Sequence, residues 1–235
     1  MIEDDTMTVD RERMKAICQE IIDRKLNVVW TCNARADVPL DVLEKMKEAG
    51  CRLMCVGFES ADQQILNNIM KGTKIEKIEQ FVEDSKKAGI LIHGCFMIGN
   101  KGETKESIKK TSEWAKKLDV DTAQFFPIMV YPGTRAFNWA KENDFLTTTN
   151  YAEWLNPDGT HNSIISTDKL TNKELVDACD EARMDYYARP KFLTQKIIQG
   201  ITNPKEFPRL FKSGKTFLKY WLNRYPNKEI KKETS

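Results

Sequence analysis

The stretch KAGILIHGCFMIGNKGET, residues 87–104, contains the end of a helix, a strand and a glycine-framed turn in succession. Gly89 follows a charged amphipathic run, at the place where a helix C-cap favours positive φ. The apolar run after Gly89 is typical of a buried parallel strand, which is covered on both faces. Gly99 and Gly102 then frame a tight turn, and residues 103–104 open the next helix. We therefore expect one βα unit of a parallel α/β fold here.

The same alternation of charged helix and short apolar strand repeats along the first 143 residues. Strands are predicted near residues 27–32, 52–58, 90–98 and 121–128. Helices are predicted near residues 9–24, 40–49, 61–69, 74–88, 104–117 and 133–143. Strand–helix units of ~25–40 residues are typical of a parallel sheet. Two interpretations stay open: a small doubly wound domain, or a barrel open at its amino-terminal side, in which the residues before Asp4 end a further strand.

Beyond residue 145 this alternation stops, and the sequence becomes polar and rich in turns. Thr171 and Glu174 have the spacing of a capping box, which opens a helix to about residue 188. Thr73 and Glu76 have the same spacing before an earlier predicted helix. We therefore divide the chain into a partial barrel at residues 1–145 and a helical extension at residues 146–235.

Composition places the chain among globular proteins. It has 235 residues, 40% hydrophobic and 31% charged, and no apolar run approaches the ~20 residues of a membrane span. The net charge is +2, and residues 205–235 hold nine Lys/Arg against three Asp/Glu; a basic tail on a slightly acidic body is not the pattern of a nucleic-acid-binding domain. The polar, acidic opening is not a signal peptide, and six irregularly spaced cysteines indicate reduced thiols in a cytoplasmic protein.

Polar groups or glycine turns follow every predicted strand, at the end where parallel βα folds bind ligands. Five such ends in succession suggest a ligand with charged and hydrogen-bonding parts. The residues concerned are Asp4, Asp5, Asn33, Arg35, Glu59, Ser60, the turn Gly99–Glu103 and the segment Gln124–Pro127.

Several of these residues have a purely structural interpretation as well. Asp4 and Asp5 would suit the amino-terminal end of the next helix. Arg35 could pair with Asp37 on the surface, and Ser60 could be the N-cap of the helix that follows it.

Glu59 is the most specific candidate for a ligand contact, because it shares one face of a strand with Leu53, Cys55 and Gly57. If that face points into the barrel, a carboxylate stands at its mouth.

The cysteines and histidines lack the sequence spacing of a metal site. Cys51 and Cys55 form the one close cysteine pair, but in a strand their positions lie ~13 Å apart, so they cannot share a cluster. His93 and His161 have no metal-ligand partner at useful spacing, and no pairing supports nucleophilic catalysis. The sequence therefore predicts no metal ligand in this chain and leaves the catalytic residues unassigned.

Five stretches occur in one order over roughly residues 1–145: EDDTMTVDRERM, VVWTCNARAD, GCRLMCVGFESADQQILNNIMKGT, KAGILIHGCFMIGNKGET and DTAQFFPIMVYPGT. In this order they resemble the radical S-adenosylmethionine (SAM) superfamily, in the cobalamin-binding branch that includes hopanoid-biosynthesis enzymes and the anaerobic magnesium-protoporphyrin monomethyl ester cyclase. The fold that the resemblance implies is α/β: a partial (β/α)6 TIM-like barrel, from the second or third strand to the sixth, with a carboxy-terminal helical appendage.

The resemblance also implies SAM-binding roles for eight residues. They are Asp4 and Asp5 near the SAM amino group, Arg35 near its carboxylate, Glu59 and Ser60 near its ribose and methionine part, Gly99 and Glu103 beside the adenosyl group, and Gln124 by the adenine or the substrate.

The family's chemistry uses a 4Fe–4S cluster to cleave SAM to a 5′-deoxyadenosyl radical, which implies modification of an unactivated carbon. The implied partners are a small-molecule or lipid-like substrate and an electron donor such as flavodoxin or ferredoxin, without nucleic acid. Cobalamin use by the full-length protein is left open. The family's Cys-x-x-x-Cys-x-x-Cys loop is absent from this sequence, so we expect the cluster ligands upstream and expect this chain alone to be inactive.

Further alternatives stay open beside the enzymatic interpretation. The chain could be a non-catalytic SAM- or nucleotide-binding module that lacks a cluster, or a complete small α/β domain that binds a phosphate ester. Its basic tail, with Phe207, Phe211 and Trp221 among lysines, could contact a membrane surface or pack as a helix over the barrel.

Overall fold

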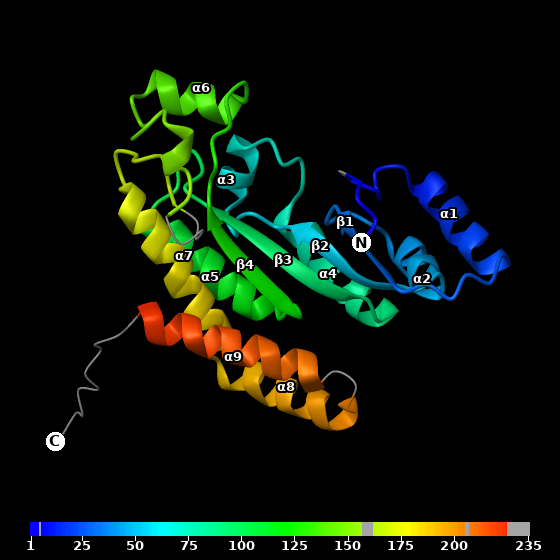
Figure 1. The fold of residues 1–235 in the computed structure, drawn as a ribbon. Helices are drawn as coiled ribbons and strands as arrows, with labels where there is room; N and C mark the ends of the chain where they lie inside the picture. Colours follow the sequence, from blue (N-terminus) through cyan, green and yellow to red (C-terminus); the bar gives the residue numbers. More distant parts are fainter. Residues whose placement is uncertain (5, 157–161, 205–206, 225–235) are drawn as a thin grey trace. The chain divides into compact units, whose positions relative to one another are not determined.

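A computed structural model describes residues 1–4, 6–156, 162–204 and 207–224 (Figure 1). The chain divides into two compact units, residues 1–183 and 184–235, which we describe separately. His161, one of the two histidines considered above, and Asp5 lie outside the described residues.

The first unit is built on a parallel sheet with the strand order β1-β2-β3-β4. The strands are β1 (Trp30–Ala34), β2 (Cys51–Gly57), β3 (Leu91–Ile98) and β4 (Thr122–Pro127). Ile2 continues the sheet beyond β1, since its N–H donates to the Thr31 carbonyl at 2.8 Å and it forms a parallel bridge with Cys32. The sheet is an open one in the described residues, so the prediction of a partial barrel is confirmed.

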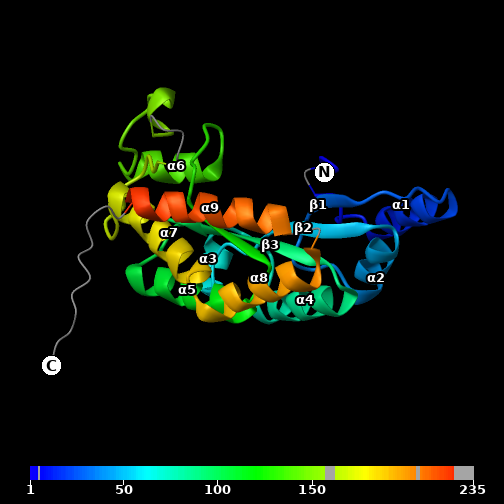
Figure 2. The same cartoon turned by 60° about the horizontal axis from the view of Figure 1, so that its bottom comes forward.

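Helices alternate with these strands as the periodicity predicts. They are α1 (Arg11–Asp23), α2 (Leu40–Glu48), α3 (Gln63–Asn68), α4 (Ile75–Ala88), α5 (Lys105–Leu118), α6 (Arg135–Glu142), a 3-10 turn (Tyr151–Glu153) and α7 (Asn172–Tyr187). Gly89 ends α4 with φ 74°, as expected for a glycine C-cap. Figures 1 and 2 show α4 and α5 together on one side of the sheet.

One of the two predicted capping boxes is wrong. Helix α4 begins after Lys74 without a side-chain cap, and the Ile75 N–H donates instead to Oε1 of Gln63 at 3.2 Å. A tertiary contact from α3 has replaced the local cap. The second box is confirmed, because Thr171 and Glu174 each accept the other's backbone N–H.

The hydrophobic core lies between the sheet and its helices. Phe96 of β3 stacks on Phe125 of β4 at 5.0 Å between ring centroids. Trp114 of α5 meets both Phe96 and Phe58 edge-on, which closes an aromatic layer under the sheet. This layer fixes the strand ends relative to α5.

The segment after residue 145 begins by packing on the first unit. Ser166 N–H donates to the Phe145 carbonyl, Leu175 is fully buried, and Arg183 donates to the Phe125 carbonyl at 3.2 Å. The first compact unit therefore extends to residue 183, while the domain division at residue 145 stays a prediction.

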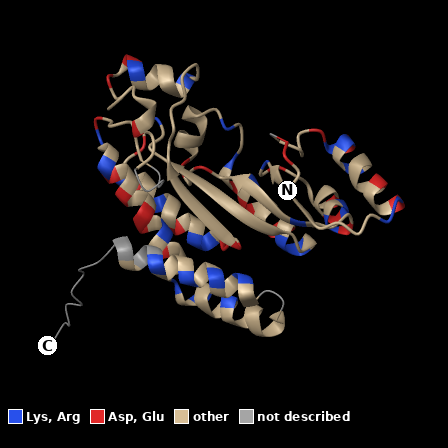
Figure 3. Ribbon diagram, in the orientation of Figure 1, with Lys and Arg blue, Asp and Glu red and all other residues tan. Residues whose placement is uncertain are grey.

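The second unit contains α8 (Pro190–Thr202) and α9 (Phe207–Arg224). Gly200 of α8 faces α9, since a Cβ there would make ordinary van der Waals contact with Phe207 at 3.4 Å and with Leu210 at 3.7 Å. The charged residues of both helices are Lys and Arg; those before residue 220 are blue in Figure 3. None of the described helices has the length and apolar character needed to cross a membrane.

Candidate functional site

The two faces of the sheet differ in burial. Along β3, Ile92, Gly94, Phe96 and Ile98 are buried against the helices, and the residues between them are partly exposed. We call the partly exposed side the open face. Its members are Thr31, Asn33, Leu53, Cys55, Gly57, Leu91, His93, Cys95, Met97, Thr122, Gln124 and Phe126. Strands β3 and β4 carry no Asp, Glu, Lys or Arg and appear tan in Figure 3, so the open face mixes apolar and neutral polar side chains there.

A bulge separates Cys51 from the open face. The register moves from Trp30 opposite Cys51 to Thr31 opposite Leu53, so Arg52 is an extra residue in β2. Cys51 is buried with the helices, whereas Cys55 lies on the open face. The prediction that these two cysteines cannot share a cluster holds, and the bulge strengthens it.

Three potential metal ligands meet on the open face: Cys55, His93 and Cys95. Their ligand atoms all lie within 4.8 Å of one another, and the two sulfurs are 3.6 Å apart. The ring of His93 is held from β4, with Nδ1 2.8 Å from Thr122 Oγ1 and Nε2 3.3 Å from Gln124 Oε1. Spacing along the sequence does not reveal this group, because Cys55 and Cys95 come from two strands and lie 40 positions apart.

The two thiols of this group share a hydrogen bond. The sulfur–sulfur hydrogen bond lowers the pKa of the Cys55 thiol, and the same bond together with burial raises the pKa of the Cys95 thiol. Cys55 is therefore the thiolate-prone member of the pair near neutral pH.

Glu59 is positioned by a left-handed turn just past β2. Its φ is 66°, its N–H donates to the Cys95 carbonyl, and its own carbonyl accepts from Met97 N–H. The carboxylate turns back over Gly57 and pairs with Lys71, whose Nζ lies 2.7 Å from Oε1. Glu59 thus presents a carboxylate beside the open face, accompanied by a lysine, and its contact with SAM stays a prediction.

Ser60 holds a turn together and does not cap a helix. The N-cap of α3 is Asp62, whose Oδ1 accepts from Gln64 and Ile65 N–H. Ser60 is fully buried, and its hydroxyl lies 3.3 Å from Oγ1 of Thr111 in α5. The N-cap interpretation of Ser60 is therefore wrong, and its SAM contact stays a prediction.

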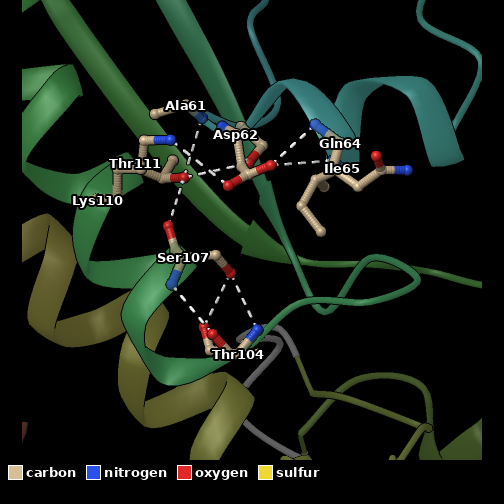
Figure 4. A network of polar contacts seen from close by, with 9 residues as sticks. Ala61, Asp62, Gln64, Ile65, Thr104, Ser107, Lys110 and Thr111 are labelled. Atoms are coloured by element: carbon tan, nitrogen blue, oxygen red, sulfur yellow. Dashed lines mark hydrogen bonds and ion pairs between the residues drawn. The ribbon is translucent and has the colours of Figure 1, made fainter.

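Thr111 ties this turn to α5. Its hydroxyl accepts from Ala61 N–H and donates to the Ser107 carbonyl, both at 3.0 Å; both bonds are drawn in Figure 4. The same view shows the cap at the start of α5, where Thr104 and Ser107 bond each other. The turn that carries Glu59 is therefore anchored through buried hydrogen bonds.

The glycine-rich turn after β3 is closed by a buried carboxyl group. Gly99, at φ 101°, and Asn100 both donate their N–H to Oε2 of Glu103, the latter at 2.9 Å. Glu103 is 3% exposed, and burial raises its pKa to about 7. Its second oxygen, Oε1, is buried without a hydrogen-bond partner among the described residues. A Cβ at Gly99 would crowd Ile128 and Leu175, at 3.1 and 3.2 Å.

The amino-terminal candidate Asp4 lies beside β1. Its carbonyl accepts from Asn33 Nδ2 at 3.3 Å, its Oδ1 accepts from Thr6 N–H, and its Oδ2 is 3.7 Å from Arg13. The structure therefore places Asp4 at the carboxyl end of β1, next to the open face, with an ionic neighbour.

Arg35 and Gln124 have different surroundings. Arg35 pairs with Asp37, at 3.3 Å between Nε and Oδ2, so the surface ion pair considered from the sequence is present. Gln124 reaches His93 on the open face. Of the predicted residues, the structure gathers Glu59 and Gln124 around the Cys55–His93–Cys95 group.

Comparisons with known proteins agree with this architecture. Residues 3–115 match the model of the radical SAM superfamily. An uncharacterized methyltransferase of Pyrococcus horikoshii is 34% identical over 197 residues, which are 83% of this chain and 42% of that protein. The anaerobic magnesium-protoporphyrin IX monomethyl ester cyclase of Rubrivivax gelatinosus is 29% identical over 140 residues, 58% of this chain and 25% of that protein.

The fold has solved counterparts. The radical SAM methyltransferase TsrM from Kitasatospora setae, solved with cobalamin and a [4Fe-4S] cluster, superimposes with a TM-score of 0.59 at 18% identity, over 80% of this chain and 42% of that one. The chain spans less than half the length of each of these three proteins. The open parallel sheet and the sequence match together establish that this chain belongs to the radical SAM superfamily.

Proposed function

We propose that this chain forms the SAM- and substrate-facing wall of a radical SAM enzyme that modifies an unactivated carbon of a small molecule. The observation that carries the proposal is that the superfamily match, residues 3–115, contains β1 to β3 and the whole turn that presents Glu59. Ligands of parallel βα folds bind at the strand ends where this turn lies.

The open face has groups that suit SAM. The Glu59 carboxylate can accept hydrogen bonds from ribose hydroxyls or from the SAM ammonium group. Gln124 and Asn33 offer neutral amides on neighbouring strands, as an adenine or a carboxylate requires. Lys71 holds the Glu59 side chain in place and moderates its charge.

The iron–sulfur cluster of the superfamily does not fit the residues of this chain. Such a cluster takes thiolate ligands, three of them from the family's motif loop. Cys18, Cys32, Cys51 and Cys179 are at most 1% exposed within the packed core. Only Cys55 and Cys95 present sulfurs to the open face, and two thiolates are too few. We propose that the ligands come from outside this sequence, and we assign no step of the reaction to a cluster held here.

The names of the relatives support carbon modification by methyl transfer or ring closure, since one is a methyltransferase and the other a cyclase. Methyl transfer is the first candidate, with the substrate on the open face beside SAM. The reductant that such an enzyme needs would be of the flavodoxin or ferredoxin class. The likeness to TsrM is one of fold alone and carries no argument for cobalamin in the whole protein.

Calorimetric titration of the chain with SAM tests the proposal. We expect Glu59→Gln to weaken SAM binding at least ~10-fold, about 1.4 kcal/mol. Glu79→Gln is the matched control, because Glu79 bonds Trp114 on the helix side and should leave SAM binding unchanged. A folded chain that binds no SAM, or equal effects of both variants, would contradict the proposal.

A second experiment separates the enzyme from a non-catalytic module. The chain is produced together with a cluster-bearing segment and supplied with SAM and a strong reductant. The enzymatic proposal predicts 5′-deoxyadenosine as a product. SAM binding without any 5′-deoxyadenosine would instead assign the chain to the non-catalytic SAM-binding class.

A further inference from the structure

We propose that Cys55, His93 and Cys95 form a binding site for a soft divalent metal ion, best matched by zinc, on the open face of the sheet. The site is separate from any iron–sulfur cluster, and it does not depend on SAM binding.

The distances fit a tetrahedral zinc ion. Zinc binds thiolate sulfur at about 2.3 Å and imidazole nitrogen at about 2.0–2.1 Å, so two sulfurs of one tetrahedral site lie about 3.8 Å apart. The sulfurs of Cys55 and Cys95 are 3.6 Å apart, and a ring nitrogen of His93 completes a group within 4.8 Å. Both ring nitrogens of His93 contact β4 in the metal-free chain, so metal binding would replace one of these two hydrogen bonds.

The backbone holds the three ligands in place before any metal binds. Cys55 is directly opposite His93 in the β2–β3 register, and Gly57 is opposite Cys95. Both strands are central in the sheet and hydrogen-bonded on each side. The site therefore differs from a chance surface cluster, whose ligands sit on independent loops.

The histidine also has the outer support that metal-binding histidines usually show. Thr122 and Gln124, both of β4, contact the two ring nitrogens of His93. When one nitrogen binds a metal, the hydrogen bond of the other fixes the ring orientation. Thr122 and Gln124 can each supply that second bond.

Ligand chemistry decides the class of ion. Two thiolates and one imidazole favour soft or borderline ions over magnesium or calcium, which take oxygen ligands. Two thiolates also neutralise a divalent ion, which suits a half-buried face. Three protein ligands leave the fourth position open for water or for a nitrogen, oxygen or sulfur atom of the substrate.

The competing fate of the two thiols is an intramolecular disulfide between Cys55 and Cys95. It would consume the same sulfurs and leave His93 without a role. The experiment is therefore done anaerobically on the reduced, chelator-stripped full chain, in which this disulfide cannot form without an oxidant.

Cobalt titration measures the site directly. We expect one Co²⁺ per chain with thiolate-to-cobalt charge-transfer absorption, displaced by one Zn²⁺. Cys55→Ser, Cys95→Ser and His93→Gln should each weaken binding at least ~10-fold, about 1.4 kcal/mol. Cys18→Ala, which removes a buried thiol from α1, is the matched control and should bind as the parent does. Circular dichroism verifies that each variant is folded.

Alkylation of the cysteines in the parent chain tests the site without any substitution, so the result does not depend on whether a variant folds. Cys55 and Cys95 are partly exposed and the other four cysteines are buried, so these two should label first. Stoichiometric Zn²⁺ should protect both, as mapped by peptide mass spectrometry. The proposal is overturned if Zn²⁺ protects neither thiol, or if Co²⁺ binding survives Cys55→Ser and Cys95→Ser or falls equally in Cys18→Ala. Because the SAM titration above is independent, either proposal can fail alone.

Discussion

Lys71 Nζ lies 2.7 Å from Glu59 Oε1, and the pair sits directly over Gly57. A Cβ on Gly57 would lie 2.3 Å from that carboxylate oxygen and 2.9 Å from the ammonium nitrogen. The absent side chain of Gly57 therefore makes the space in which the Glu59 carboxylate reaches the open face.

Gly57→Ala should displace this ion pair with little cost in stability, because both side chains that it meets are flexible. We expect the free energy of unfolding to change by less than about 1 kcal/mol, the usual worth of a partly exposed ion pair. SAM binding should weaken as it does in Glu59→Gln. Denaturant unfolding and calorimetry on the same sample check both statements. A variant with undiminished SAM affinity would show that the carboxylate position does not matter.

Thr111→Val should destabilise the chain by about 1–3 kcal/mol, because it leaves the buried Ala61 N–H without its acceptor. Thr111→Ser retains the hydroxyl and should recover most of the loss. Urea unfolding compares the three proteins. Equal stability of Thr111→Val and the parent would mean that the turn after β2 is not anchored through α5.

Glu103 should make stability depend on pH. Its pKa is about 7 when folded and near 4.5 in the unfolded chain. The contribution of protonated Glu103 to the free energy of unfolding is therefore fully present below about pH 4.5. It is lost as the pH rises through about 7, and the loss is on the order of 3 kcal/mol. Glu103→Gln cannot ionise. Between pH 5.5 and 8.5, the parent should lose more unfolding free energy than Glu103→Gln, and parallel profiles would contradict the assignment.

Reconstitution with iron and sulfide should yield no stable 4Fe–4S cluster on this chain. The reason is that four of its six cysteines are buried in the core and two remain. Iron and sulfide analysis after gel filtration, with visible absorption, makes the measurement. A stoichiometric cluster that survives filtration would require a rearranged core and would overturn the account of the cysteines.

The hydrophobic periodicity of the sequence predicted the strands and helices well, because the periodicity follows directly from which side chains are buried. Strand β3 was expected at residues 90–98 and occupies Leu91–Ile98, since each alternate side chain packs on a helix. Caps were less predictable. Ser60 and Asp62 are both good N-cap residues, and only the path of the turn selects Asp62.

The group of Cys55, His93 and Cys95 could not be predicted from the spacing of these residues along the sequence. Cys55 and Cys95 are 40 positions apart, and they meet because β2 and β3 are neighbours in a particular register. A register assignment for the parallel strands, combined with the side-chain alternation, is the signal that would have revealed it. Similarly, Lys71 lies in the connection after α3, and nothing in its local sequence indicates its pairing with Glu59.

Methionine-methyl NMR during a SAM titration tests most directly whether SAM binds the open face. Met97 lies on that face and its N–H donates to the Glu59 carbonyl, whereas Met14 and Met46 are fully buried in α1 and α2. With the chain's methionine methyl groups labelled with carbon-13 and the SAM unlabelled, we predict that the Met97 signal shifts saturably while those of Met14 and Met46 stay in place. Shifts confined to Met14 and Met46, or an unchanged Met97 signal at saturating SAM, would contradict the account.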